Sequence, residues 1–170
     1  MGFHIVTDSN ADLSAADRES FSDFSYLHVP YFINDVEGDP GITGHEFFEA
    51  MRNGANTRTA QINPPTFIAL YEELIAEGKR EFLSITLSSK LSGLYESAVN
   101  AANTVMKKHP DTTILVTDTI SASIGMGHLV KSAVEARDQG KSLSETRDLI
   151  EARKHRICHW FTVGDLTYLK

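Results

Sequence analysis

A serine-rich loop between a buried apolar segment and a predicted helix offers the clearest chance of chemistry in this chain. The apolar run 82–87 is followed by Ser88-Ser89-Lys90-Leu91-Ser92-Gly93. The first turn of a helix leaves backbone N–H groups unpaired, and such groups bind a carboxylate or a phosphate well when a hydroxyl lies nearby. Ser92 supplies a hydroxyl, and Gly93 has no Cβ to obstruct a ligand. The loop therefore predicts a site for an anionic group.

Two more predicted strands end in short polar segments. These segments are Thr7-Asp8-Ser9-Asn10 and Thr117-Asp118-Thr119. In an open parallel sheet, ligands bind in the crevice outside the carboxyl ends of the strands. We therefore expect all three polar segments to meet at one crevice, with Ser9 and Thr119 as candidates for lining it.

Other interpretations of the serine loop remain open at this point. Serine is a favoured N-cap residue, so Ser92 could cap the following helix whether or not anything binds there. Alternatively, Ser92 could be the nucleophile of a serine acyl hydrolase, which needs a base within hydrogen-bond reach, and His128 is the candidate. A third alternative is an interaction module whose crevice is closed. The Gly-x-Ser-x-Gly, Walker and dinucleotide-binding motifs are absent from the sequence.

The acidic residues at the strand ends raise the question of a metal site. Asp8 and Asp118 could form a metal-binding or acid–base pair, although aspartate after a strand is more often a turn former. The chain contains seven histidines and one cysteine. Cys158 and His159 alone supply too few ligands for zinc. The sequence predicts no metal and no cofactor.

Composition restricts the class of protein. The formal net charge is −7 and no long basic run occurs, which argues against binding to nucleic acid. A single cysteine, Cys158, excludes an internal disulfide and favours a reducing compartment. No apolar run approaches the roughly 20 residues that cross a bilayer, and the start of the chain does not resemble a secretion signal. We expect one cytoplasmic domain without stable membrane insertion.

Apolar segments alternate with helical patterns along the chain. Helices are predicted after the capping residues Ser14, Thr43, Asn63 and Ser142, and after the serine loop, where Leu91 is assigned to the inward face. The segment 53–63 is predicted to be a loop. Strands are predicted near 3–7, 26–32, 82–87, 113–117 and 158–163. This alternation predicts an α/β fold, a three-layer α/β/α sandwich around a mostly parallel, Rossmann-like sheet.

Several motifs together resemble the DegV family of fatty-acid-binding proteins. Thr59-Ala60-Gln61 is similar to the family's Thr-Ser-Gln motif. The other matching segments are Ile5-Val6-Thr7-Asp8-Ser9-Asn10-Ala11-Asp12-Leu13, Ser88 to Ala98, Thr117-Asp118-Thr119 with Gly125-Met126-Gly127, and Phe161 to Lys170. They occur in the family's order over the whole length of the chain.

The resemblance implies a function and a site. Thr59 and Ser92 would hold the carboxylate of a long-chain fatty acid, palmitate-like or oleate-like, with help from the backbone around Gly93. Ala60 and Gln61 would line the same crevice, and the acyl chain would lie in an apolar tunnel. The protein would present the acid to a separate fatty acid kinase that phosphorylates it for phospholipid synthesis. It would have no nucleotide site of its own and would not be an enzyme.

The chain departs from the family pattern in three places. Ala60 stands where the family usually has serine, and Leu94 where it commonly has threonine. The family also continues with a carboxy-terminal domain that supplies the other wall of the tunnel, together with a histidine and an arginine near the head group. We therefore expect residues 1–170 to correspond to the amino-terminal α/β domain, with the carboxy-terminal domain absent from this chain.

Overall fold

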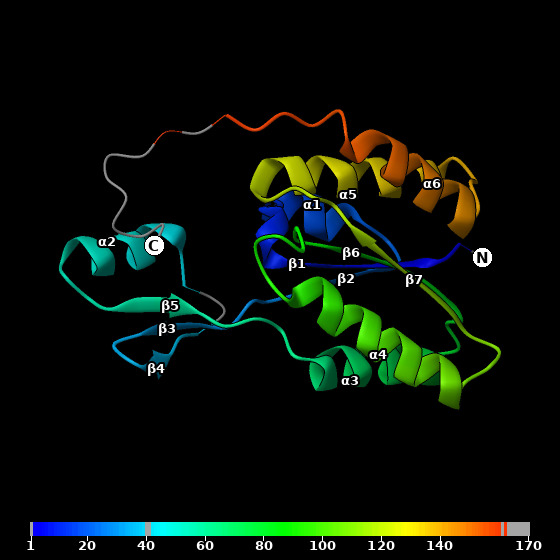
Figure 1. Cartoon of the computed structure of the whole chain (residues 1–170), viewed down its shortest axis with the longest axis horizontal. Coiled ribbons are helices and arrows are strands. Elements are labelled where there is room, and N and C mark those ends of the chain that lie inside the picture. Colours follow the sequence, from blue (N-terminus) through cyan, green and yellow to red (C-terminus); the bar gives the residue numbers. More distant parts are fainter. Residues whose placement is uncertain (1, 40–41, 161, 163–170) are drawn as a thin grey trace.

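A parallel sheet forms the centre of the larger of two lobes (Figure 1). The computed structural model describes residues 2–39, 42–160 and 162. The sheet has the strand order β2-β1-β6-β7, and all neighbouring strands are parallel. Its strands are β1 (His4–Asp8), β2 (Phe24–Leu27), β6 (Glu81–Thr86) and β7 (Thr113–Asp118). The strands predicted near 3–7, 82–87 and 113–117 are thus confirmed within one residue at each end.

Helices cover both faces of this sheet, which confirms the predicted three-layer α/β/α arrangement. Figure 1 shows α3 (Pro64–Ala76) and α4 (Leu94–Lys108) on one face. The opposite face carries α1 (Ala15–Ser20), α5 (Ser123–Asp138) and α6 (Leu143–Lys154). None of the described helices is long and apolar enough to span a membrane.

Each face of the sheet has its own apolar core, because successive side chains of a strand point to opposite faces. On β1, Ile5 belongs to the core beneath α5 and α6, whereas Val6 belongs to the core beneath α3 and α4. On β6, Leu83 and Phe82 divide in the same way, and all four side chains are fully buried. Strands covered on both faces must be apolar almost throughout, which is why these segments were recognisable in the sequence.

Local capping fixes the starts of several helices where the sequence predicted them. Ser14 accepts a hydrogen bond from the backbone N–H of Asp17, and Asn63 accepts one from Thr66. Thr43 and Ser142 each form a complete capping box. These caps satisfy backbone donors that the first helical turn leaves unpaired.

A small antiparallel sheet forms the second lobe, which the sequence did not predict. It contains β3 (Tyr31–Ile33), β4 (Val36–Glu37) and β5 (Thr57–Thr59) in the order β4-β3-β5, together with α2 (Gly44–Arg52). In sequence, the lobe is a single insertion between β2 and α3. The predicted loop 53–63 therefore contains a strand that pairs with a distant segment.

The prediction of one strand over 26–32 was wrong because the chain passes from one sheet to the other at Val29 and Pro30. The Val29 N–H donates to Ser9 Oγ at 2.9 Å instead of joining a strand ladder. Pro30 has no N–H, and its carbonyl accepts a hydrogen bond from Ala60. The segment is thus divided between β2 in the parallel sheet and β3 in the small lobe.

Two other sequence predictions need correction. The predicted strand 158–163 is absent over residues 158–160 and 162, while residues 161 and 163 lie outside the described residues. Here Ile157 and His159 pack against the first turn of α5, where a Cβ on Gly125 would meet both side chains. Leu91, assigned to the inward face of a helix, lies instead in the loop before α4 and is 68% exposed.

Candidate functional site

A cavity of about 360 Å³ lies between residues of the two lobes and contains most of the predicted site. The small lobe contributes Thr59 at the end of β5, followed by Ala60 and Gln61. The loop before α4 contributes Ser92 and Gly93. The remaining lining residues are Asn10, Val29, Leu87, Leu91 and Leu94. The fold thus places beside one cavity two segments that lie far apart in the sequence.

The three serines of the loop differ in what their hydroxyls contact. Ser88 Oγ accepts a hydrogen bond from the Lys90 N–H at 3.3 Å. Ser89 donates to the Asp118 carboxylate from its N–H at 3.1 Å and from its Oγ at 2.5 Å. Among the described residues, the Ser92 hydroxyl has no hydrogen-bond partner, yet it lines the cavity. Two serines therefore shape the loop, and the third is available to a ligand.

The interpretation of Ser92 as an ordinary N-cap is wrong. The N-cap of α4 is Gly93, and no side chain caps this helix. The Ser92 N–H donates to the Ser88 carbonyl at 3.3 Å, which closes the preceding turn. The first turn of α4 therefore begins beside the cavity without the side-chain acceptor that caps most other helices here. Its N–H groups and the positive end of the helix dipole favour an anion.

Gly93 is needed where Gln61 crosses the start of α4. A Cβ built on Gly93 would lie 2.7 Å from Gln61 Oε1. The Gln61 amide nitrogen also donates to Ser97 Oγ at 3.5 Å, a long contact that directs the side chain toward the helix. The absence of a side chain at Gly93 therefore lets Gln61 form one wall of the cavity.

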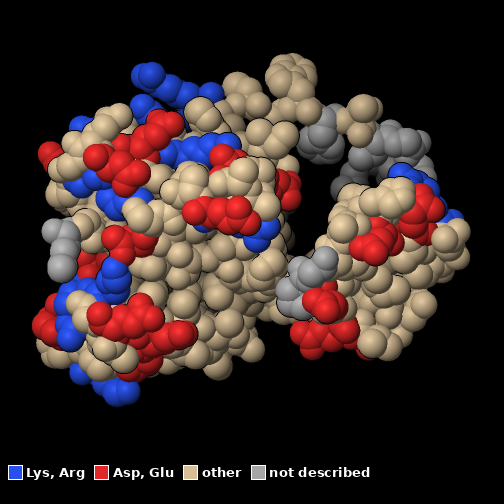
Figure 2. Space-filling model, turned by 180° about the vertical axis from the view of Figure 1, so that it is seen from behind, with Lys and Arg blue, Asp and Glu red and all other residues tan. Residues whose placement is uncertain are grey.

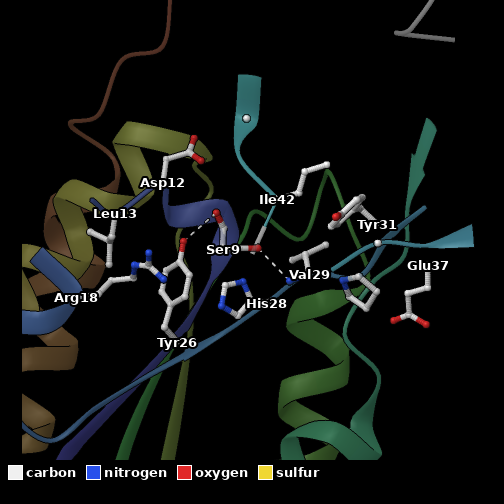
Figure 3. Close-up of a pocket in the computed structure, with 13 residues that line it drawn as sticks. Ser9, Asp12, Leu13, Arg18, Tyr26, His28, Val29, Tyr31, Glu37 and Ile42 are labelled. Carbon is white, nitrogen blue, oxygen red and sulfur yellow. Dashed lines mark hydrogen bonds between the residues drawn. The ribbon is translucent and has the colours of Figure 1, made fainter. Parts of the chain in front are cut away.

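Ser9 and Thr119, the other crevice candidates, do not line this cavity. The Thr119 side chain is fully buried, and its hydroxyl donates to the Thr86 carbonyl at 2.8 Å. Ser9 Oγ accepts from the Val29 N–H, and Ser9 borders a separate cavity of about 560 Å³ (Figure 3). There the Tyr26 hydroxyl donates to the Ser9 carbonyl at 3.4 Å, with the Arg18 guanidinium 4.6 Å from the centre of the Tyr26 ring.

Comparison with known proteins decides the family. The DegV family model, described as an uncharacterised protein family, matches residues 2–170. The chain belongs to the DegV family. A DegV domain-containing protein of Clostridium perfringens is 35% identical over 172 residues, covering 99% of this chain and 58% of the relative. The chain therefore spans little more than half the length of this relative.

Solved DegV structures share the fold. A DegV family protein from Thermus thermophilus, described by its fatty-acid binding, is 32% identical with a TM-score of 0.75, over 91% of this chain and 54% of that one. The fatty acid kinase B3 protein of Streptococcus pneumoniae, solved with linoleic acid, is 26% identical with a TM-score of 0.74, over 91% of this chain and 55% of that one.

The two aspartates at the strand ends of this DegV chain are turn formers. Asp8 Oδ1 accepts hydrogen bonds from the backbone N–H and the side-chain amide of Asn10. Asp118 Oδ1 accepts from the N–H groups of Ser89 and Ile120. Within residues 2–39, 42–160 and 162, no group of three or more His, Cys, Asp or Glu residues could hold a metal ion.

A third, more apolar cleft of about 780 Å³ lies beside the serine loop of this DegV chain. Leu91 lines both this cleft and the Ser92 cavity. Three further exposed apolar side chains line the cleft, namely Ile120, Ile124 and Trp160. His128 also lines this cleft, whereas the Ser92 cavity has no histidine among its lining residues. His128, the candidate base of the hydrolase alternative, therefore lines a different cavity from Ser92.

Proposed function

We propose that the chain binds a long-chain fatty acid by its carboxylate and presents it to a separate fatty acid kinase in the cytoplasm, without catalysing a reaction itself. Thr59 and Ser92 donate hydrogen bonds to the carboxylate in this proposal, and the backbone at Gly93 adds the N–H groups of the first turn of α4. The observation that carries the proposal is the position of Thr59 and Ser92 on one cavity, each with a hydroxyl unpaired among the described residues.

The chemistry of the lining supports an anionic head group. Neither Lys nor Arg is among the residues that line the cavity, so neutral hydroxyls and backbone dipoles would balance the ligand charge. Hydrogen bonds to an ionised acceptor are shorter and stronger than bonds between neutral groups, so these donors would interact favourably with a carboxylate. The adjoining apolar cleft, which shares Leu91 with the cavity, supplies surface for an acyl chain.

Presentation to a kinase requires that the carboxylate stay accessible. Thr59, Gln61 and Gly93 are all exposed residues, so the head-group site opens to solvent. Figure 2 shows an opening between the larger and the smaller lobe, with cationic and anionic side chains interspersed over the larger lobe. The similarity to the fatty acid kinase B3 protein supports the kinase as the partner.

Isothermal titration of palmitate or oleate into the protein tests the proposal. Thr59→Val and Ser92→Ala should each lower the affinity by about 1.5–3 kcal/mol, because each removes a hydrogen bond to a charged acceptor. The double variant should lose less than the sum of the two, since the second loss acts on a head group already loosened.

Thr104→Val is the matched control, because the Thr104 hydroxyl donates to the Asn100 carbonyl on the exposed side of α4, away from the cavity. Its affinity should equal that of the wild type. Unchanged affinity in both single variants would place the head group elsewhere. Labelling of Ser92 by a fluorophosphonate probe, together with ester turnover lost in Ser92→Ala, would instead establish the hydrolase alternative.

A further inference from the structure

Asn10 lines the same cavity as Thr59 and Ser92, although it comes from a third part of the chain. It lies in the short 3-10 helix η1 (Ser9–Ala11), directly after β1. The Asn10 side-chain amide offers two N–H donors, and a carboxylate ligand needs donors. Of the polar segments at the strand ends, the one after β1 therefore reaches the cavity through Asn10 and not through Ser9.

Asp8 holds the Asn10 amide in a defined orientation. Asp8 Oδ1 accepts from the Asn10 backbone N–H at 2.9 Å and from Asn10 Nδ2 at 2.5 Å. Because an ionised carboxylate only accepts hydrogen bonds, it is the nitrogen of the amide that faces Asp8. One Nδ2 hydrogen is used in this bond, and the second remains for another acceptor.

Packing against α5 fixes the backbone that carries Asn10. A Cβ on Gly127 of α5 would lie 2.4 Å from the carbonyl oxygen of Ala11, so the helix approaches η1 more closely than any other residue type would permit. Asp12, which closes η1, has the left-handed backbone conformation with φ 46°. Close packing therefore constrains the turn on the carboxyl side of Asn10, and the hydrogen bonds to Asp8 hold it on the amino side.

Asp8 itself has an oxygen that lacks a well-formed hydrogen bond. Asp8 is 1% exposed, and its buried Oδ2 has no partner of good geometry among the described residues, although the Leu87 backbone N–H lies near enough to favour the ionised carboxylate. Burying a polar atom unpaired costs free energy that an ordinary turn former would avoid. A carboxylate kept in such a place beside a cavity wall suits a residue that orients a neighbouring donor.

We propose that Asn10 is a third side-chain donor to the ligand carboxylate and that Asp8 is the positioning residue that orients its amide. This inference rests on the proposed function, because it concerns the same head group as Thr59 and Ser92. It adds a contact from the end of β1, so that the carboxylate is held from three separate parts of the chain.

A comparison of fatty acid with the fatty alcohol of equal chain length tests the inference. Both ligands bury the same acyl chain, but only the acid has the charged acceptor. Asn10→Ala should weaken binding of the acid about tenfold or more and should leave binding of the alcohol within about twofold. Asp8→Ala should likewise lower the ratio of the affinity for the acid to the affinity for the alcohol. Asp8→Asn keeps an oxygen that can accept from Asn10, so it should preserve the wild-type ratio of affinities.

The outcomes separate this inference from the proposed function. Suppose that Ser92→Ala lowers the ratio of acid affinity to alcohol affinity, but Asn10→Ala leaves this ratio unchanged or weakens the binding of both ligands equally. Asn10 is then structural only, and the inference fails. If wild-type protein binds neither ligand, or binds both alike, the proposed function fails and the inference fails with it. Thermal unfolding of each variant identifies any loss that comes from an unfolded protein, and variants are compared only at temperatures where they are folded.

Discussion

The two ends of strand β1 bury ionisable side chains in opposite settings. His4, at the amino end, is 5% exposed, and its ring forms a hydrogen bond with Ser25 Oγ at 2.9 Å. Asp8, at the carboxyl end, is 1% exposed and bonded to Asn10. Each keeps one buried side-chain atom without a well-formed hydrogen bond among the described residues, His4 Nδ1 and Asp8 Oδ2. The same strand thus places a buried base at one edge of the sheet and a buried acid at the other.

The surroundings of the two residues differ more than their burial does. Around His4 the charges are paired with one another, because Lys79 forms an ion pair with Asp23 and Arg137 donates to the Asp23 carbonyl at 2.9 Å. Asp8 has no cation among the groups that influence its ionisation, and its neighbour Asn10 opens onto a cavity. Ion pairs therefore surround the amino edge, whereas the carboxyl edge borders the cavity where a ligand is proposed to bind.

Removing His4 should give the largest change in the pH dependence of stability. Burial lowers the pKa of His4 to about 4 from 6.5. Between these values the unfolded chain binds more protons than the folded protein, so His4 makes the free energy of unfolding fall as the pH falls from 6.5 to 4. The loss amounts to about 3 kcal/mol. Urea unfolding of His4→Gln across this window should lack that loss, with His45→Gln on the exposed surface as the control.

Asp8 should change the free energy of unfolding with pH in the opposite direction to His4. Burial raises the pKa of Asp8 from 3.8 to about 6, so the folded protein binds more protons than the unfolded chain between these values. The free energy of unfolding should therefore fall as the pH rises from 4 to 6, by up to about 3 kcal/mol. Because the two residues change the free energy of unfolding in opposite directions with pH, their effects partly cancel in the wild-type protein.

Asp8→Asn should expose the contribution of His4 as a steeper loss of stability on acidification than the wild type shows. Asp35→Asn is the control, because Asp35 is exposed and its ion pair with Arg58, at 3.4 Å, lies on the surface. Equal slopes for Asp8→Asn and the wild type would show that Asp8 titrates normally, and the contrast between the two ends of β1 would then be lost.

Gly127→Ala should destabilise the carboxyl edge by about 1–3 kcal/mol, since its Cβ would be forced against the Ala11 carbonyl and one backbone would have to move. Gly44→Ala in α2 is the control, because its Cβ would only reach ordinary contact with Phe48, at 3.8 Å. Chemical denaturation measures both. A stability loss no larger than that of the control would mean that η1 is not rigidly held.

Gly93→Ala should have the smallest effect on stability, within about 0.5 kcal/mol, because the atom that its Cβ would meet is the mobile end of Gln61. Ligand binding should respond more, since the displaced Gln61 side chain narrows the cavity. Titration of fatty acid alongside urea unfolding distinguishes the two responses. A stability loss comparable to that of Gly127→Ala would show that Gln61 cannot move aside.

The elements of the large lobe could be predicted because each is marked by a short pattern of neighbouring residues. Apolar runs marked β1, β6 and β7, and capping residues such as Ser142 marked the helix starts. The small lobe was missed because β5 consists of Thr57, Arg58 and Thr59, which have no apolar pattern, and because its stability depends on pairing with β3 across a long loop. Pairing between distant segments leaves little trace in either segment alone.

Only some of the residues at the candidate site could be predicted from the sequence. Family resemblance placed Thr59 and Ser92 together, and the fold brings both to one cavity. The sequence could not show that the Thr119 hydroxyl is used by the Thr86 carbonyl, or that Asn10 and not Ser9 reaches the cavity. Which of two adjacent polar residues points to a ligand depends on the turn that carries them, here a single turn of η1.

The small lobe is one uninterrupted insertion, joined to the large lobe by the segments around Val29–Pro30 and Ala60–Gln61. Thr59 belongs to this insertion, whereas Ser92 and Asn10 belong to the parallel-sheet lobe. The insertion is therefore a natural unit for chimeras. Exchanging it between family members would replace one side of the head-group site in a single step and would leave the two cores of the parallel sheet intact.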